Sequence, residues 1–268
     1  MLNTEKRNEK TMHVDKMDTI DIVRVMNEEN MNSVLAVEKA LPQIAIAVDK
    51  VAEAFLNGGR LFYIGAGTSG RLGIIDAAEC PPTFGVPHEL VQGIIAGGNE
   101  RVFKAGENEE DNYQKGVDIV KEKLNGKDVL VGVSAAGGAK YVLGALETAK
   151  GMGCFTVGVT SNEGTAITKT ADLAIVCDTG AEVITGSTRL KAGNSQKFVL
   201  NMLTTGAMIK TGKVYENLMI NLKPSNEKLR LRVIRITSQI LGIEEEAAIP
   251  LLEANDWDIR RTVESNKK

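Results

Sequence analysis

Residues 65–70 read Gly-Ala-Gly-Thr-Ser-Gly, between a short apolar run and a stretch of helical character. A glycine-rich turn at the start of a helix lets backbone N–H groups approach an anion at the positive end of the helix dipole. Thr68 and Ser69 add hydroxyl donors, which favours a small phosphate monoester as the ligand. We predict that the phosphate binds to Gly67, Thr68, Ser69 and Gly70. A tight turn without a ligand is the alternative.

Two other kinds of phosphate site fit this turn less well. The glycines match the dinucleotide pattern G-x-G-x-x-G, which also requires an acidic residue about 20 positions later, at the end of the second strand. That strand here ends Gly-Ile-Ile-Ala-Gly-Gly, residues 93–98, without a carboxylate. A Walker loop is excluded because no Gly-Lys followed by Ser or Thr closes the turn.

Carboxylates follow the turn at two places. Glu79 lies just before Cys80 and the pair Pro81-Pro82, where we expect the helix to break. Residues 107–111, Glu-Asn-Glu-Glu-Asp, form an acidic run that on composition alone is typical of a solvated loop or helix start. We interpret Cys80 as a buried, inert thiol rather than a nucleophile.

The composition is that of an ordinary globular protein. The chain has 268 residues, of which 43% are hydrophobic and 25% charged, and a net charge of −3 with scattered Lys and Arg. This distribution argues against nucleic-acid and membrane partners, since both favour a concentrated basic surface. Three widely spaced cysteines indicate free thiols in a reducing cytoplasm. His13 and His88 are too few for a His-rich metal site, and His88 is interpreted as structural.

Neither end of the sequence has the pattern of a membrane or secretory segment. No apolar run reaches the roughly 18–20 residues that a bilayer span requires. The N-terminal residues are polar and mixed in charge, unlike a secretory signal. We therefore expect a cytoplasmic protein.

Short apolar runs alternate with helical stretches through the middle of the chain. Five of these runs predict buried strands, at residues 60–65, 89–98, 128–134, 155–161 and 173–178. After the third run, four residues fall on one face of a helix: Val142, Ala145, Leu146 and Ala149. The alternation predicts an α/β fold with a mostly parallel five-stranded sheet.

Helical segments flank this α/β core. Residues 19–54 are expected to be helical with an interruption at Pro42, and residues 187–212 are a long helix candidate. Near the C-terminus an apolar helix face is followed by two short helices around Asn255-Asp256. We divide the chain into an N-terminal helical segment (1–54), a central α/β domain (55–222) and a small C-terminal helical module (223–268).

Longer motifs resemble those of one enzyme family. Residues 63–87, YIGAGTSGRLGIIDAAECPPTFGVP, and residues 182–219, which begin EVITGSTRLKAG, strongly resemble the N-acetylmuramic acid 6-phosphate etherases of the sugar isomerase (SIS) fold. Residues 4–8 (TEKRN), 93–98 and 226–236 are also similar, so the resemblance covers nearly the whole chain. It implies a three-layer αβα SIS domain, no metal or organic cofactor, a cytoplasmic location, and homodimers with sites near the subunit interface.

The resemblance also implies a reaction and its residues. The family converts N-acetylmuramic acid 6-phosphate and water to N-acetylglucosamine 6-phosphate and D-lactate, in peptidoglycan recycling. Glu79 matches the glutamate of the family's E-C-P-P-T motif, which protonates the lactate oxygen. Glu110 matches the second catalytic glutamate, in an E-x-x-E-D segment, and is the expected base, with Glu109 and Asp111 as the residues most easily mistaken for it. Further implied phosphate and sugar contacts are Ser134, Gly137, Ser187, Thr188 and Lys191.

This reaction needs two proton-transfer groups. In the open-chain sugar the C1 carbonyl acidifies the C2 proton, so a base can remove that proton while an acid protonates the departing lactate oxygen. Water then adds to the unsaturated aldehyde at C3. Each group is expected to contribute about 10²- to 10⁴-fold to the rate. For Ser187, Thr188 and Lys191 the alternative is a helix N-cap with a surface lysine.

One loop departs from the family pattern. Where the etherases carry A-S-G-R-T-P, residues 135–140 read AAGGAK, which keeps Gly137 but lacks two hydroxyls and a guanidinium. Phosphate binding should weaken by about 1–3 kcal/mol per charged hydrogen bond, because Lys140 restores a charge without a bidentate contact. The N–H groups of Gly137 and Gly138 are still expected to bind an anion. A non-catalytic sugar-phosphate sensor comparable to glucokinase regulatory protein, and an aldose–ketose isomerase, are the other functions considered.

Overall fold

A computed structural model of the chain describes residues 1–106, 109–222, 224 and 226–266. Its helices are α1 (Thr19–Lys39), α2 (Leu41–Leu56), α3 (Gly67–Phe84), α4 (Glu100–Phe103), α5 (Tyr113–Lys123), α6 (Lys140–Gly151), α7 (Ala166–Thr170), α8 (Lys191–Lys210), α9 (Glu227–Leu241), α10 (Glu245–Glu253) and α11 (Ile259–Asn266). Its strands are β1 (Leu61–Gly65), β2 (Val91–Ile95), β3 (Val129–Val133), β4 (Phe155–Thr160), β5 (Leu173–Val176), β6 (Val214–Tyr215) and β7 (Leu218–Met219). Short 3-10 helices cover Asn3–Glu5, Glu9–Thr11, Val14–Lys16 and Glu109–Asp111.

The five strands predicted from the sequence form one parallel sheet in the order β2-β1-β3-β4-β5. Every residue of β1 and β3 is buried, as expected for central strands covered by helices on both faces. The order reverses between β1 and β3, because the chain leaves β1 toward the edge strand β2 and returns on the other side to β3. The predicted α/β class and five-stranded sheet are confirmed.

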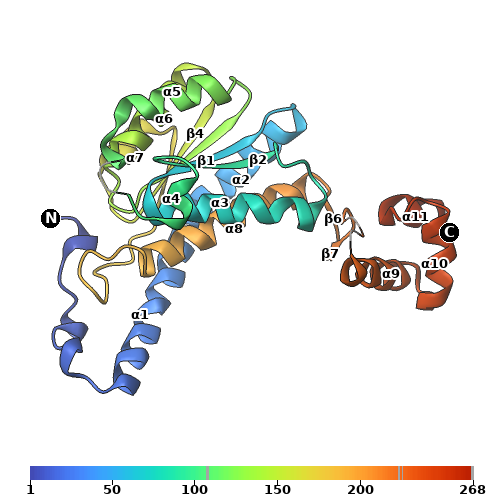
Figure 1. Cartoon of the computed structure of the whole chain (residues 1–268), viewed down its shortest axis with the longest axis horizontal. Helices are drawn as coiled ribbons and strands as arrows, with labels where there is room; N and C mark the ends of the chain where they lie inside the picture. Colours follow the sequence, from blue (N-terminus) through green and yellow to red (C-terminus); the bar gives the residue numbers. More distant parts are fainter. Residues whose placement is uncertain (107–108, 223, 225, 267–268) are drawn as a thin grey trace.

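Alternate side chains of each strand enter two separate cores. Leu61 and Tyr63 of β1 pack with α2, α3 and α8 on one face, whereas Phe62 and Ile64 pack with α5, α6 and α7 on the other. Figure 1 shows these helices in layers above and below the sheet. The predicted face of α6, from Val142 to Ala149, is fully buried in the second core. The result is the three-layer αβα sandwich implied by the resemblance.

Helix α3 continues through the two prolines at which we expected it to break. Pro81 and Pro82 lie in its last turn, and the helix ends only at Gly85, whose φ is +64° and whose N–H donates to the Pro81 carbonyl. Prolines so near the C-terminus remove only the hydrogen bonds to the Ala77 and Ala78 carbonyls. Burial of Cys80 and Phe84 in the first core holds this last turn in place. The expected helix break was therefore wrong, since packing outweighed the missing donors.

The two ends of the chain extend from the sandwich in different ways. Figure 1 shows α1 running outward, with the N-terminal arm (residues 1–18) folded back toward the sheet. α2 begins beside Pro42, as predicted, and packs on the sheet, so it forms part of the sandwich. The boundary that we drew at residue 54, between the N-terminal segment and the α/β domain, therefore places most of α2 outside the sandwich to which this helix belongs.

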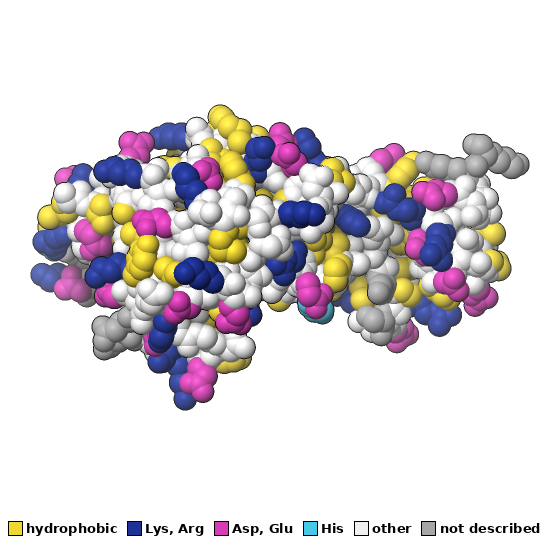
Figure 2. All heavy atoms as spheres, turned by 90° about the horizontal axis from the view of Figure 1, so that it is seen from above, with side chains coloured by type: hydrophobic (Ala, Val, Ile, Leu, Met, Phe, Trp, Pro, Cys, Tyr) yellow, Lys and Arg dark blue, Asp and Glu magenta, His cyan; other side chains and the backbone are white. Residues whose placement is uncertain are grey.

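The C-terminal helices form a module with its own core. Val233, Ala248, Leu252 and Ile259 of α9, α10 and α11 are buried together, and Ile220 and Leu222 from the preceding segment join them. Arg230 lies over the ring of Trp257, 4.2 Å from its centroid. The module appears at the far end of Figure 1, beyond the β6–β7 hairpin, and as a separate lobe in Figure 2.

The surface carries charges of both signs. On the face seen in Figure 2, Lys and Arg side chains alternate with Asp and Glu, and no large area has a single sign. Within the described residues, no helix combines the length and apolarity of a membrane span, and no cluster of three or more His, Cys, Asp or Glu side chains could hold a metal ion.

Candidate active site at the phosphate loop

The candidate site lies where the strand order of the sheet reverses. The loop after β1 leads into α3 on one face of the sheet, and the loop after β3 leads into α6 on the other. The carboxyl ends of two strands whose connections diverge leave a crevice, which is where open α/β sheets bind ligands. We name residues 66–70 the β1 loop and residues 134–139 the β3 loop.

Glycines allow the β1 loop to turn directly into a helix. A Cβ atom on Gly65 would lie 2.7 Å from the Gly70 nitrogen, and one on Gly70 would lie 2.7 Å from the Gly65 carbonyl oxygen. Gly67 is the first helical residue and has φ +53°. The first N–H groups of α3 therefore have no intrahelical acceptor and stand at the positive end of its dipole. This arrangement suits a phosphate.

The two hydroxyls of the β1 loop have different surroundings. Thr68 is half-buried and faces the start of α8, since a Cβ atom on Gly193 would lie 3.6 Å from Thr68 Cγ2 and 3.4 Å from the Thr188 carbonyl oxygen. The segment that carries Thr188 therefore lies beside the β1 loop, and phosphate or sugar contacts by Ser187 and Thr188 stay a prediction. Ser69 is buried, and its hydroxyl donates to Gln196 Oε1 at 2.9 Å.

The β3 loop offers fewer donors than the β1 loop. Gly137 has φ +73°, and its N–H donates to the Ser134 carbonyl at 3.0 Å and to Ser134 Oγ at 3.1 Å. This N–H is turned inward and is not available to an anion, contrary to our expectation. Ser134 accepts at Oγ and keeps its own proton for donation. Ala136 and Gly138 are exposed at the edge of the crevice.

Glu110 shares a cavity with the β1 loop. The cavity has a volume of about 420 Å³, within the range of small-molecule sites, and is lined by Ala66, Gly67, Arg71, Ala96, Arg101, Gly106, Glu109 and Glu110. Arg71 of α3 donates its Nε–H to the Val102 carbonyl at 2.8 Å, which ties the α4 segment to the phosphate loop. Two carboxylates, two guanidiniums and a helix N-terminus therefore meet at one place.

The three neighbouring acidic residues differ in their partners. Glu109 is held by Lys115 at 3.2 Å and Arg101 at 3.9 Å, and Asp111 is paired with Lys140 at 3.4 Å. Glu110 is exposed to the cavity and forms no ion pair with any described residue. Its carboxylate is the one that remains available to a substrate. Glu107, the first residue of the acidic motif, lies outside the described residues.

Glu79 lies elsewhere in the same chain. It is exposed on α3, twelve residues after Gly67, which corresponds to a rise of about 18 Å along the helix. It does not line the cavity that contains Glu110. The structure thus brings Glu110, but not Glu79, to the phosphate loop of its own chain.

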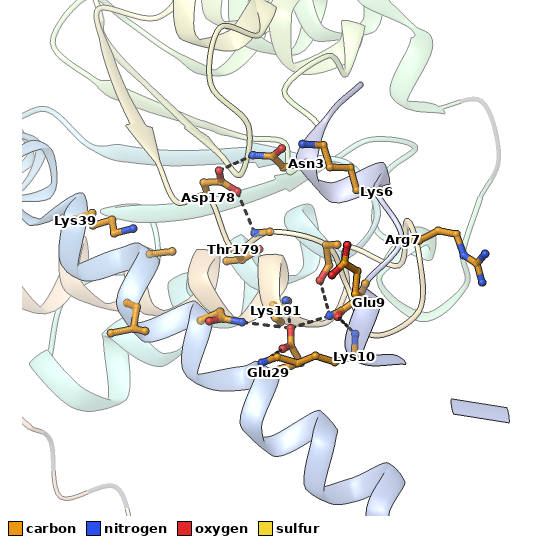
Figure 3. Close-up of a pocket in the computed structure, with 16 residues that line it drawn as sticks. Asn3, Lys6, Arg7, Glu9, Lys10, Glu29, Lys39, Asp178, Thr179 and Lys191 are labelled. Carbon is orange, nitrogen blue, oxygen red and sulfur yellow. Dashed lines mark hydrogen bonds and ion pairs between the residues drawn. The ribbon is translucent and has the colours of Figure 1, made fainter. Parts of the chain in front are cut away.

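Lys191, the first residue of α8, is buried in an ion pair. Its Nζ lies 2.5 Å from Glu29 Oε2 of α1, with both side chains at most 4% exposed. Burial alone would raise the pKa of Glu29, but hydrogen bonds from Lys191, Lys10 and Asn8 outweigh it and lower that pKa to about 2. Figure 3 shows Lys10 of the N-terminal arm and Lys191 of α8 beside Glu29. A phosphate contact by Lys191 stays a prediction, and the observed pair anchors α1 to α8.

The chain is similar in sequence to proteins that share one name. It is 50% identical over 262 residues to an N-acetylmuramic acid 6-phosphate etherase of Symbiobacterium thermophilum, covering 98% of this chain and 87% of that protein. An etherase of the same name from Clostridium botulinum (strain Langeland) is 50% identical over 263 residues, with the same coverage. The chain belongs to the N-acetylmuramic acid 6-phosphate etherase family. This confirms the resemblance drawn from the motifs.

Two further comparisons concern the fold of this etherase family member. The family model for the glucokinase regulatory protein N-terminal SIS domain matches residues 43–150. Phosphoheptose isomerases from Francisella tularensis (TM-score 0.52, 21% identity) and Neisseria gonorrhoeae (TM-score 0.53, 18% identity) are similar over 72% and 71% of this chain, and over 98% of each isomerase. At these identities the likeness shows the SIS fold alone.

Some buried polar groups near the site were not predicted from the sequence. Asp76 of α3 accepts from Tyr63 at 2.8 Å and from Asn201 at 2.6 Å, which fixes α3 to α8 one turn before Glu79. Burial raises the pKa of Asp76 despite these donors. Glu182 accepts the N–H groups of Lys191 and Ala192 at 3.1 and 2.9 Å and so caps α8. No local pattern marks these bonds, because each joins two different elements and Asp76 and Asn201 are 125 positions apart.

The thiol and imidazole groups lie outside the cavity that contains Glu110. Cys80 is buried, as expected, and this burial raises its pKa to about 12, which disfavours the thiolate form. The other two cysteines are likewise buried and free. His88 is exposed outside the cavity that contains Glu110.

Proposed function

We propose that the protein cleaves the D-lactyl ether of N-acetylmuramic acid 6-phosphate by elimination followed by addition of water. N-acetylglucosamine 6-phosphate and D-lactate are the products. The observation that carries this proposal is the free carboxylate of Glu110 in one cavity with the start of α3, in a chain 50% identical to etherases. The reaction belongs to cell-wall amino sugar catabolism in the cytoplasm and needs no cofactor.

In this mechanism the 6-phosphate is bound by the first N–H groups of α3, with hydroxyls from Thr68, Ser69 and Ser134. Glu110 removes the C2 proton of the open-chain aldehyde. Glu79 donates a proton to the ether oxygen. The C3–O bond then breaks, and D-lactate leaves with that oxygen as its neutral hydroxyl group. Water then adds its hydroxyl to C3 of the unsaturated aldehyde and gives its other proton to Glu79, while Glu110 returns its proton to C2, so that both carboxyl groups recover their starting state.

The separation of the two glutamates supports a homodimeric site. A substrate of this size does not span the roughly 18 Å from the start of α3 to Glu79, so Glu79 must act at the phosphate loop of a second copy. The outer surface of α1 carries unusually many apolar side chains that are about half exposed or more: Ile20, Val23, Met31, Val34 and Leu35. Ile75, one turn before Glu79, is 55% exposed. Burial of these groups between two chains would stabilise such a dimer.

Mixing two inactive variants tests this shared site. Glu79→Gln and Glu110→Gln are each expected to abolish D-lactate release. When they are unfolded and refolded together, half of the dimers contain one chain of each kind, and each of these has one intact site. Activity should return to about a quarter of the wild-type level. A mixture without activity, although mixed dimers form, would show that both glutamates act within one chain.

The reaction itself is tested with substrate in ¹⁸O-labelled water. We expect D-lactate without label and N-acetylglucosamine 6-phosphate with ¹⁸O at C3, because C3–O cleavage leaves the original oxygen on lactate. Label in lactate, or no lactate above the level without protein, would contradict the proposal.

A non-catalytic sugar-phosphate sensor is the second candidate. The substitutions in the β3 loop favour it, because they remove donors that an enzyme would use to hold its substrate. The match of residues 43–150 to the regulatory-protein SIS domain is compatible with it. A sensor would bind the sugar phosphate in calorimetry without releasing lactate.

A further inference from the structure

A buried hydrogen bond connects α8 to the phosphate loop. Ser69, the third residue of α3, is 9% exposed, and Gln196, in the second turn of α8, is 2% exposed. The bond joins two oxygens, Ser69 Oγ and Gln196 Oε1, at 2.9 Å, so the serine proton must lie between them. Ser69 therefore donates to α8.

The other atom of the same amide is unsatisfied. Gln196 Nε2 is buried and finds no hydrogen-bond partner among the described residues. A buried donor without an acceptor is uncommon in proteins and points to a role beyond packing. Here the unpaired N–H₂ lies on the side chain that receives the Ser69 proton.

The direction of this bond matters for phosphate binding. A hydroxyl has one proton, and while Gln196 Oε1 holds it, Ser69 presents lone pairs that repel an anion. Rotation of the amide by 180° would bring Nε2 to Ser69 Oγ as a donor. The serine proton would then be free to point at a phosphate oxygen. The N–H₂ group would gain an acceptor in Ser69 Oγ, while Oε1 would give up the Ser69 donor and take the position that Nε2 now holds.

We propose that Gln196 is a positioning residue that sets the donor direction of Ser69, and that its amide reverses when a phosphate monoester binds. The chain from amide N–H through serine hydroxyl to phosphate oxygen polarises each bond along it, which strengthens the last one. This inference rests on the proposed function, because the ligand is the 6-phosphate of that substrate. It identifies a residue of α8 that acts on the phosphate without touching it.

Calorimetry with N-acetylglucosamine 6-phosphate tests this inference. Gln196→Glu supplies an acceptor that cannot donate when ionised, so Kd should rise about 30- to 100-fold at pH 8. Gln196→Met removes both the amide acceptor and the amide donor, so that nothing orients the Ser69 hydroxyl, and Kd should rise about 3- to 10-fold. In a Ser69→Ala background, Gln196→Met should have no further effect. Asn194→Asp, on the exposed side of the same helix, is the control for added charge and should change Kd less than about 3-fold.

The pH dependence separates a donor switch from a structural role. A protonated carboxyl can donate to Ser69, so the ratio of the Gln196→Glu Kd to the wild-type Kd should fall toward 1 between pH 8 and pH 5. A ratio that stays constant, or variants that bind the ligand as the wild-type protein does, would overturn this inference but not the proposed function. Failure of the wild-type protein to bind the ligand would overturn the proposed function as well. If Gln196→Glu does not fold, the Gln196→Met and Ser69→Ala cycle decides, and additive effects would contradict the inference.

Discussion

The β1 loop and the β3 loop occupy equivalent places at the reversal of strand order, yet they differ in the number and direction of the donors that they offer. The β1 loop has two hydroxyls and enters α3 immediately at Gly67. The β3 loop has one hydroxyl, that of Ser134, and directs the Gly137 N–H inward to that same serine. Both loops are followed by helices whose positive ends face the crevice, so the difference lies in the loops themselves, in their hydroxyls and in the inward direction of the Gly137 N–H.

This contrast indicates how the site can keep its proton-transfer residue while its affinity for the substrate changes. Glu110 lines the same cavity as the β1 loop, and the bond from Arg71 to the Val102 carbonyl holds the α4 segment at that loop. Neither feature involves the substituted residues of the β3 loop. Lys140, which follows the β3 loop as the first residue of α6, forms an exposed ion pair with Asp111 of the acidic segment. Substitutions in the β3 loop should therefore change substrate affinity and leave proton transfer intact.

The largest expected effect comes from adding a Cβ atom inside the β1 loop, at Gly70. A Cβ on Gly70 would lie 2.7 Å from both the Gly65 carbonyl and Ile95, so Gly70→Ala should reduce the free energy of unfolding by about 2–4 kcal/mol. A Cβ on Gly138, in the β3 loop, would meet nothing within 4 Å. Gly138→Ala should therefore change the free energy of unfolding by less than about 0.5 kcal/mol. Urea denaturation of both variants checks this. Equal losses would remove the claimed difference between the loops.

Restoring donors to the β3 loop should have the next largest effect. The triple variant Ala136→Ser, Gly138→Arg and Ala139→Thr introduces the residues found in the family pattern, and Thr also suits the N-cap position of α6. KM should fall about 10- to 100-fold with kcat nearly unchanged, because the phosphate is bound equally in substrate and transition state. Steady-state kinetics measures this. An unchanged KM would mean that the β3 loop does not contact the phosphate.

Lys140 should have the smallest effect. Its ion pair with Asp111 has both side chains more than 60% exposed and is screened by water and salt. Lys140→Ala should therefore change KM less than about 3-fold and the free energy of unfolding by less than about 1 kcal/mol. A larger rise in KM that disappears at high salt would show that Lys140 contacts the phosphate directly.

The sequence was sufficient to predict the layers of the fold. Each buried strand is a short apolar run bounded by glycine or polar residues, and the apolar face of α6 repeats at helical spacing. The path of α3 through Pro81 and Pro82 was not predictable, because it depends on packing against distant residues. For the same reason α8 begins at Lys191, later than the predicted stretch, where Glu182 caps its N–H groups.

The candidate site was predictable in type but not in arrangement. Glycines and hydroxyls of the β1 loop can be recognised locally, because the turn itself requires them. The bonds from Ser69 to Gln196 and from Lys191 to Glu29 join residues 127 and 162 positions apart. Glu110 could not be distinguished from Glu109 and Asp111 by composition, and the structure separates them by their cation partners.

Exchange of the C2 proton tests the central claim most directly. The product, N-acetylglucosamine 6-phosphate, is incubated in deuterated water and deuterium at C2 is followed by NMR, with circular dichroism to confirm folding. Glu110→Gln should abolish exchange, and the matched variant Glu109→Gln, whose residue is already held by Lys115, should keep it within about 10-fold of the wild-type rate. Exchange at the wild-type rate in Glu110→Gln would contradict the assignment of Glu110 as the base.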